Sequence, residues 1–293
     1  MRMDVWLAQQ LPQHSRGRIQ GWIREGRLQV DGTPQTQTRA KLEADQQIRL
    51  QMPAVDDAPP TIEAEDIALE VLYEDADILV INKPAGLTVH PGAGQARGTL
   101  QNALLHYRPA LAAVPRAGIV HRLDKLTSGL LLVAGSPEAH TQLVRMLAER
   151  TITREYLALV WGEVIAGGTI DAPLARDSRD RRRYLVGQGG RDAVTHFRVE
   201  ERFRKHTLLR VKLETGRTHQ IRVHMKHRKT PLVGDPVYGR RGDPLAAQLP
   251  RQALHAERLA FAHPISEAPC EFRQPVPEDM ADVLQHLRDV NAG

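Results

Sequence analysis

The chain has 293 residues and a formal net charge of +5, and its 41% hydrophobic and 26% charged residues are typical of a soluble globular protein with more than one domain. No apolar run is long enough to cross a bilayer, no signal peptide is expected at the N-terminus, and the single Cys270 cannot form an internal disulfide. We therefore expect a cytoplasmic protein without a membrane partner, and the excess of Lys and Arg favours a polyanionic one.

Residues 3–50 are predicted to form one small unit. A short helix is expected over residues 4–11, and Ser15 can cap a second helix that runs to about Glu25. A strand at 27–30 and a return strand at 47–51 follow.

Three arginines, Arg16, Arg18 and Arg24, gather around the second of these helices. They either contact RNA phosphates or form an ordinary solvated helix face. The runs Ser-Arg-Gly-Arg-Ile and Gly-Arg-Leu-Gln-Val-Asp-Gly resemble the S-four type RNA-binding domain. The resemblance implies that these arginines bind RNA.

Residues 53–66 are rich in Pro, Ala and acidic residues and show no periodicity, which is typical of an extended linker. The linker divides the chain into an expected RNA-binding domain at residues 1–52 and a larger domain at residues 67–293. Its composition predicts that the two domains can move relative to one another.

The larger domain is predicted to be α+β, with a mixed, mainly antiparallel sheet, because runs of strands outnumber the helices. Strands are expected at residues 69–73, 78–82, 155–161, 194–201 and 208–214, and helices from Pro137 to about Arg150 and after Pro277. The last helix is expected to dock on the core through an apolar stripe of Met280, Val283, Leu284, Leu287 and Val290.

The segment from Gly118 to Val133 places a dense polar loop between two apolar pieces. The loop contains Asp124, and a loop held between rigid strands is a usual position for catalytic groups. Alternatively, Asp124 only bonds backbone N–H groups around Thr127 and Ser128 and shapes the turn.

A second polar segment, from Thr215 to Met225, follows a strand. If a helix begins at Thr218, Arg222 can point back towards the strand ends and favour the ionised form of a nearby carboxylate. Alternatively, this is a basic helix that faces solvent. His219 and His224 in this second polar segment and His227 just after it invite a metal site, but no HExxH or CxxC pattern supports one.

The motif His121-Arg122-Leu123-Asp124, followed by Thr127-Ser128-Gly129, resembles the active-site motif of the RluA family of pseudouridine synthases. The resemblance extends over nearly the whole chain. Its other marks appear in order at Asn82–Gly86, Arg154–Ala158, Gly216–His224, Gly234–Gly239 and Leu254–Ala256. Arg154 stands where many members of the family carry lysine, which keeps the charge.

The resemblance implies the pseudouridine synthase fold and a catalytic set in which Asp124 is the nucleophile, Arg222 pairs with it and Tyr156 stacks on the target base. It further implies that Arg122 enters the RNA stack where the uridine leaves, that His121 and Arg217 contact RNA, and that Leu123 and Ile221 line the base pocket. Such stacking has to compensate for extrusion of the base from the RNA.

The implied activity is isomerisation of specific uridines to pseudouridine in large-subunit (23S) ribosomal RNA or a pre-ribosomal particle, by a monomer. No cofactor and no metal are expected, because the bond broken and the bond formed involve the same base. Two other classes stay open. A non-catalytic RNA-binding or ribosome-assembly factor would not need an aspartate facing a polyanion, and a metal-dependent hydrolase would lose activity on chelation. The sequence leaves open whether Asp124 attacks the ribose or the ring, or assists proton removal from the sugar.

Overall fold

The computed structural model describes residues 2–11, 16–43, 45–51, 62–92, 95–180 and 182–292. The chain divides into two compact units, Met1–Thr61 and Ile62–Gly293. Within the described residues, no helix is both long and apolar enough to span a membrane.

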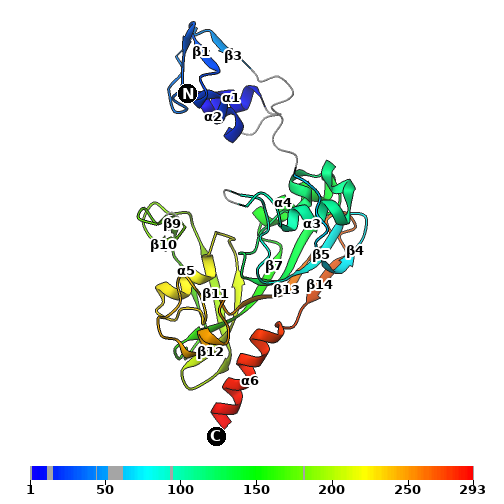
Figure 1. The fold of residues 1–293 in the computed structure, drawn as a ribbon, viewed down its shortest axis with the longest axis vertical. Coiled ribbons are helices and arrows are strands. Elements are labelled where there is room, and N and C mark those ends of the chain that lie inside the picture. Colours follow the sequence, from blue (N-terminus) through cyan, green and yellow to red (C-terminus); the bar gives the residue numbers. More distant parts are fainter. Residues whose placement is uncertain are drawn as a thin grey trace. The chain divides into compact units, whose positions relative to one another are not determined.

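The first unit contains two helices, α1 (Met3–Gln10) and α2 (Arg16–Arg24), and a sheet in the order β2-β1-β3 (Figure 1). The helices follow the prediction to within a residue or two, although Ser15, which was expected to cap α2, lies outside the described residues. The strands are β1 (Leu28–Val30), β2 (Thr33–Pro34) and β3 (Ile48–Leu50). A small core formed by Met3, Leu7, Ile19, Trp22, Ile23 and Leu28 joins these elements.

The second unit is built on a nine-stranded sheet, in the order β4-β5-β6-β13-β7-β12-β11-β8 with β14 paired to β13. All of its strand pairs are antiparallel except β13 with β6, so the predicted mixed, mainly antiparallel sheet is confirmed. The strands are β4 (Glu70–Glu74), β5 (Ile78–Lys83), β6 (Ser128–Ala134), β7 (Thr153–Trp161), β8 (Gly168–Asp171), β11 (Val194–Arg202), β12 (His206–Leu213), β13 (Leu254–Ala262) and β14 (Pro269–Arg273). A hairpin of β9 (Leu174–Arg176) and β10 (Tyr184–Val186) stands apart from this sheet (Figure 1).

Helices pack against the two halves of the sheet. Helices α3 (Leu100–Tyr107) and α4 (Pro137–Ala148) contribute to the larger core with β5 and β6, whose residues are almost entirely apolar and buried. Helix α6 (Glu278–Ala292) forms a second core with β7 and β12. Four members of its predicted apolar stripe are buried, but Val290 is 53% exposed because it lies one turn beyond Leu287, the last residue of that core.

Residues expected in the linker also contact the second unit. The backbone of Glu63 accepts a hydrogen bond from the Asn102 side chain (2.8 Å), and Glu65 accepts hydrogen bonds from the backbone of Gly98 through its carboxylate. The predicted linker of residues 53–66 is therefore attached to the second unit from residue 62 onward, and its earlier part lies outside the described residues.

Candidate active site

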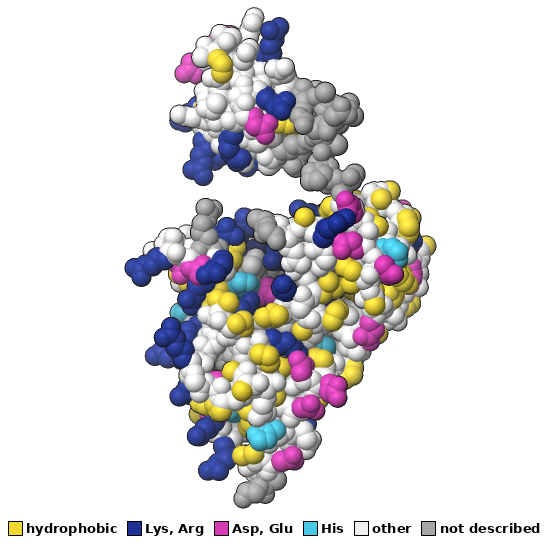
Figure 2. Space-filling model, viewed as in Figure 1, with side chains coloured by type: hydrophobic (Ala, Val, Ile, Leu, Met, Phe, Trp, Pro, Cys, Tyr) yellow, Lys and Arg dark blue, Asp and Glu magenta, His cyan; other side chains and the backbone are white. Residues whose placement is uncertain are grey.

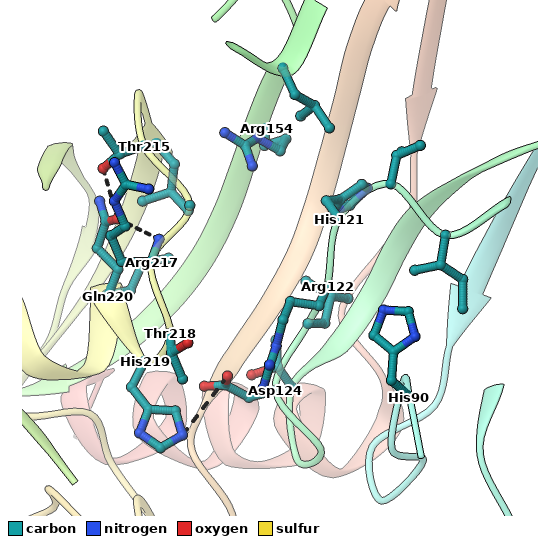
Figure 3. A pocket seen from close by; sticks show the side chains of 18 of the residues that line it. His90, His121, Arg122, Asp124, Arg154, Thr215, Arg217, Thr218, His219 and Gln220 are labelled. Atoms are coloured by element: carbon teal, nitrogen blue, oxygen red, sulfur yellow. Dashed lines mark hydrogen bonds and ion pairs between the residues drawn. The ribbon is translucent and has the colours of Figure 1, made fainter. Parts of the chain in front are cut away.

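A cleft of about 820 Å³ opens in the second unit, and both polar segments singled out in the sequence line it. Figure 2 shows that this unit is hollowed on one face, with Lys and Arg side chains near the hollow. The loop before β6 contributes Arg122 and Asp124, and the loop before α5 (Gln220–His227) contributes Arg217 and His219 (Figure 3). Folding thus joins two segments that lie about 90 residues apart in the chain.

Asp124 is fixed in the cleft by its backbone and by its carboxylate. Its backbone carbonyl accepts a hydrogen bond from Thr127 N–H (3.0 Å), whereas its Oδ2 accepts one from Arg222 Nη1 (3.0 Å). The carboxylate is 15% exposed, so one of its edges remains open to the cleft. The alternative in which the Asp124 side chain serves only to bond turn N–H groups does not describe this geometry.

The loop that carries Asp124 is held against its surroundings. Gly129, at the start of β6, has φ = +111°, and a Cβ there would lie 2.3 Å from the carbonyl oxygen of Ala256, so only glycine fits. Ser128 Oγ bonds His255 Nδ1 at 3.0 Å on the neighbouring β13. These contacts explain why the Thr127-Ser128-Gly129 run and His255 belong to one structural unit.

Lys83, at the end of β5, lies under the same loop. Its ammonium donates to the carbonyl oxygens of Pro84 (2.7 Å), Leu87 (2.9 Å) and Lys125 (3.1 Å) and is 1% exposed. Burial lowers the pKa of Lys83 to about 7, although the negative charge of Asp124 opposes this shift. Lys83 therefore joins the turn after β5 to the residue that follows Asp124.

Arg222 is buried between two carboxylates. It lies on α5 and is 4% exposed. Besides Asp124, it donates two hydrogen bonds to Asp235, from Nε to Oδ2 (2.7 Å) and from Nη2 to Oδ1 (3.0 Å). Burial disfavours its charge, but the hydrogen bonds and charge of Asp235 raise the pKa of Arg222, so the guanidinium stays charged beside Asp124.

Helix α5 begins at Gln220, two residues later than predicted. The chain first makes a turn in which His219 adopts a left-handed conformation (φ = +58°), and the Gln220 side chain accepts hydrogen bonds from Arg217 N–H and Thr215 Oγ1. The turn places His219 Nε2 4.0 Å from Asp124 Oδ1. The helix starts after Thr218, the start considered from the sequence, because these side-chain bonds compete with a first helical turn there.

His219 is also held by Tyr238. The Tyr238 hydroxyl accepts a hydrogen bond from Tyr184 N–H (2.8 Å) and lies 2.9 Å from His219 Nδ1, to which it can donate. Nε2, on the side of Asp124, then carries the imidazole proton. Burial lowers the pKa of His219, against the pull of Asp124, and this favours the neutral imidazole.

Apolar side chains form the inner wall of the cleft. Tyr156 on β7, Leu123 and Ile221 are each at most 5% exposed and line it, as the proposed base pocket requires. Burial raises the pKa of Tyr156, and the negative charge of Asp124 adds to this, so the phenol stays neutral. The walls can therefore hold a flat ring beside the Asp124 carboxylate.

The predicted RNA-contacting residues occupy different environments. Arg122 and Arg217 are exposed at the cleft, whereas His121 is half-buried and its Nε2 accepts a hydrogen bond from Leu132 N–H (3.0 Å). In the first unit Arg24 is exposed, and Arg16 donates hydrogen bonds to the buried Asp4 at 2.7 and 3.1 Å. The side chain of Arg18 lies outside the described residues.

The histidines of the second polar segment do not converge. Both ring nitrogens of His224 have protein partners, Thr195 Oγ1 (2.8 Å) and the carbonyl oxygen of Ala172 (3.0 Å), while His227 is exposed. The sequence prediction contained neither Asp235 nor Tyr238, although both fall in a run that carries the family resemblance. Their position beside Arg222 and His219 depends on tertiary contacts that no local pattern encodes.

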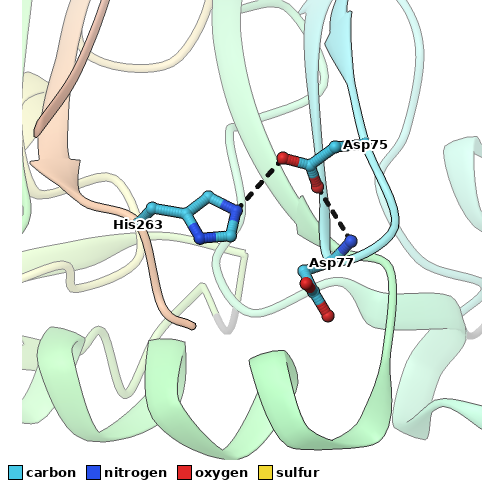
Figure 4. Close-up of side chains that lie close together, drawn as sticks. All are labelled: Asp75, Asp77 and His263. Carbon is cyan, nitrogen blue, oxygen red and sulfur yellow. Dashed lines mark hydrogen bonds and ion pairs between the residues drawn. The ribbon is translucent and has the colours of Figure 1, made fainter. Parts of the chain in front are cut away.

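A group with metal-ligand chemistry lies elsewhere, at Asp75, Asp77 and His263 (Figure 4). Asp75 Oδ1 accepts two backbone N–H bonds at 2.8 Å, and its Oδ2 accepts one from Tyr73 (2.8 Å) and faces His263 Nε2 (3.1 Å). These bonds account for the cluster as a connection between β4, β5 and the end of β13.

Comparisons with known proteins bear on both units. Residues 77–227 match the family model described as RNA pseudouridylate synthase, and residues 1–48 match that of the S4 domain. The chain is 50% identical over 301 residues to ribosomal large subunit pseudouridine synthase D of Xanthomonas campestris, with 99% of this chain and 90% of that protein covered. It is 52% identical over 297 residues to the protein of the same name from Pseudomonas aeruginosa, with 98% and 92% covered.

Solved structures show the same fold. Human RNA pseudouridylate synthase domain containing 1 is 28% identical and superposes with a TM-score of 0.59, over 79% of this chain and 97% of that one. Human RNA pseudouridylate synthase domain containing 4 is 23% identical, with a TM-score of 0.60 over 75% and 93% of the two chains, and supports the fold alone.

Proposed function

The chain belongs to the RNA pseudouridylate synthase family, and from this membership we propose that it isomerises specific uridines of large-subunit (23S) ribosomal RNA to pseudouridine, with Asp124 as the nucleophile. Members of the family are isomerases, so the expected class of enzyme is confirmed. The RNA substrate is proposed from the names of the relatives and from the S4 domain match.

The observation that carries the proposal is the carboxylate of Asp124, which a charged Arg222 orients in an apolar-walled cleft. Arg222 binds Oδ2 at 3.0 Å and is itself bound by Asp235, whereas Oδ1 makes no hydrogen bond within the described residues and lies 4.0 Å from His219 Nε2. A carboxylate preoriented in this way is the group that cleavage of a glycosidic bond requires.

The reaction balances without an outside reagent. The bond between uracil N1 and ribose C1′ breaks, the base rotates, and a bond forms between C5 and C1′. The C5 proton is released and N1 gains one. Asp124 assists the first step, either by attack on the ribose or the ring or by removal of a proton from the sugar. Tyr156, neutral and buried, offers its face to the detached base.

Arginines support recognition of the RNA. Arg122 and Arg217 at the cleft, with Arg16, Arg18 and Arg24 of the first unit, are proposed to contact phosphates or the gap left by the extruded uridine. We propose that the protein acts as a cytoplasmic monomer without metal or cofactor, on 23S rRNA or a pre-ribosomal particle.

Pseudouridine mapping tests the proposal. Positions in 23S rRNA should lack pseudouridine in cells without this protein and regain it when the wild-type chain, but not Asp124→Asn, is supplied. Unchanged modification in the deletion strain would refute the activity. Restoration by Asp124→Asn would instead favour the non-catalytic RNA-binding role.

A further inference from the structure

Arg154 on β7 is a buried cation for which the described residues provide no partner. It is 9% exposed and lines the same cleft as Asp124, and its Nε is buried without a hydrogen-bond partner. Neither a salt bridge nor a hydrogen bond to this guanidinium occurs among the residues that the structure describes. A buried charge without a counter-ion is costly for the folded state, so its presence calls for an explanation.

Three other arginines of the cleft have partners, whereas Arg116 and Arg122 are exposed and have none among the described residues. Arg150 binds the Glu214 carboxylate at 2.5 Å, Arg217 donates to the carbonyl oxygen of Asp192 at 3.0 Å, and Arg222 binds two carboxylates. Arg154 therefore differs from Arg222, the other buried arginine of the cleft, in having its charge available for something that enters the cleft.

The surroundings of Arg154 leave room for its side chain. A Cβ on Gly216 would lie 2.9 Å from Arg154 Nη1, so glycine at this position lets the loop pass close to the guanidinium. Figure 3 shows the side chain reaching from the strand towards the loop that carries Thr215 and Arg217. His121 Nδ1, which carries the ring proton because Nε2 accepts from Leu132 N–H, is a second buried donor without a partner in the described chain.

The position of Arg154 relative to the base pocket indicates which part of an RNA it can meet. Arg154 and Tyr156 are two residues apart on one strand, so their side chains share a face about 6.6 Å apart along it. Such a separation is comparable to the span of a ribose from its base to its phosphate. A nucleotide whose base rests on Tyr156 can therefore bring its backbone within reach of Arg154.

We propose that Arg154 is an interior binding site for a phosphodiester of the RNA backbone next to the extruded uridine, an inference that rests on the proposed function of the cleft. A phosphate fits better than a uracil carbonyl because it carries a full negative charge that compensates the buried guanidinium. Its paired oxygens also match the planar fork of arginine.

The test pairs a protein change with an RNA change. The protein change is Arg154→Gln, and the RNA is a 23S rRNA fragment with a neutral methylphosphonate placed at each phosphate of the modified loop in turn. Binding is measured with the full chain in an Asp124→Asn background, so that no turnover is needed. Arg154→Gln and one methylphosphonate should each weaken binding about 10- to 100-fold, and together no more than either alone.

Controls separate this site from general electrostatics. Arg154→Lys keeps the charge and should lose less affinity than Arg154→Gln. Arg288→Gln removes a charge from α6, where Arg288 pairs with Glu201, and should change binding by less than twofold. If the losses of affinity caused by Arg154→Gln and by the methylphosphonate multiply at every position, the phosphate site is refuted. It is also refuted if Arg154→Gln is coupled only to a change in the uracil carbonyls. Absence of turnover by the wild-type chain on every fragment would instead refute the proposed function.

Stability provides an independent readout. Because Arg154 is buried without a partner, Arg154→Gln should leave the melting temperature unchanged or raise it while binding falls. A fall of several degrees would mean that the guanidinium supports the fold, and the binding-site assignment would then be wrong.

Discussion

Replacing Asp235 by Asn should destabilise the protein far more than replacing Asp124 by Asn, although both carboxylates bind Arg222. The Asp235 side chain is fully buried and accepts four hydrogen bonds, two from Arg222 and two from the backbone N–H groups of Val237 and Tyr238. Asp124 is 15% exposed and accepts one hydrogen bond from Arg222.

The expected magnitudes follow from these environments. Removing one charge of a buried, hydrogen-bonded ion pair typically costs about 3–5 kcal/mol, because the remaining charge is left uncompensated. In Asp235→Asn, Asp124 compensates part of the Arg222 charge, so we expect about 3 kcal/mol and a melting temperature lower by roughly 6–12 °C. In Asp124→Asn, Asp235 still neutralises Arg222, and the cost should stay within about 1 kcal/mol.

Thermal unfolding followed by circular dichroism measures the melting temperature of each variant. Tritium release from RNA labelled at uracil C5 measures the activity of the same preparations. Asp124→Asn should be folded and inactive. Asp235→Asn should be destabilised, with residual activity at low temperature, since Asp124 remains present but less well oriented. Equal melting temperatures for the two variants would refute the assignment of Asp235 as the main counter-ion of Arg222.

Four further outcomes are expected. Asp124→Asn should bind a 23S rRNA fragment at least as tightly as the wild type, because a negative charge near the phosphates is removed; a large loss of affinity in a filter-binding assay would contradict this. Activity should survive extensive chelation with EDTA when monovalent salt keeps the RNA folded. Loss of activity that only a divalent ion restores would point to a metal. A chain beginning at Ile62 should fold and retain the cleft but bind rRNA more weakly, with a smaller salt dependence than the full chain; equal salt slopes would mean that the first unit contributes no phosphate contacts. Burial, aided by the nearby charge of Arg154, lowers the pKa of His121 to about 3, so between about pH 6.5 and pH 3 the unfolded chain binds a proton that the folded chain does not. As the pH falls through this range, the free energy of unfolding should decrease by up to about 1.4 kcal/mol per pH unit. Denaturation curves of His121→Gln should show a smaller decrease.

The elements predicted from the sequence are those with a strong local signal. Helix α4 begins at Pro137, where Ser136 accepts a hydrogen bond from Ala139 N–H, and this N-terminal pattern is readable in the chain. Strand β13 was not predicted, because its sequence mixes His255, Glu257 and Arg258 with apolar residues. It becomes a strand by pairing with β6, β7 and β14, a choice set by tertiary contacts and not by local propensity.

The site divides in the same way. Asp124, Arg222 and Tyr156 stand in polar or family-typical runs and could be singled out from the sequence, together with the apolar wall at Leu123 and Ile221. Their supporting partners could not. Asp235 lies 13 residues after Arg222, and Lys83 lies 42 residues before the carbonyl that it binds. Only the sheet and the turn before α5 bring these atoms together.

Charge balance connects the catalytic and the RNA-binding features of the cleft. A nucleophilic carboxylate has to be ionised, but an ionised carboxylate repels the phosphates of an approaching RNA. Arg222 addresses the first requirement and is itself neutralised by Asp235, so little of its charge is left for the RNA. Attraction of the RNA therefore falls to cations that are not consumed by internal pairs. Arg116 and Arg122, which are exposed at the cleft, and Arg154 in its interior are the arginines of the cleft with this property among the residues described, and their removal should weaken binding.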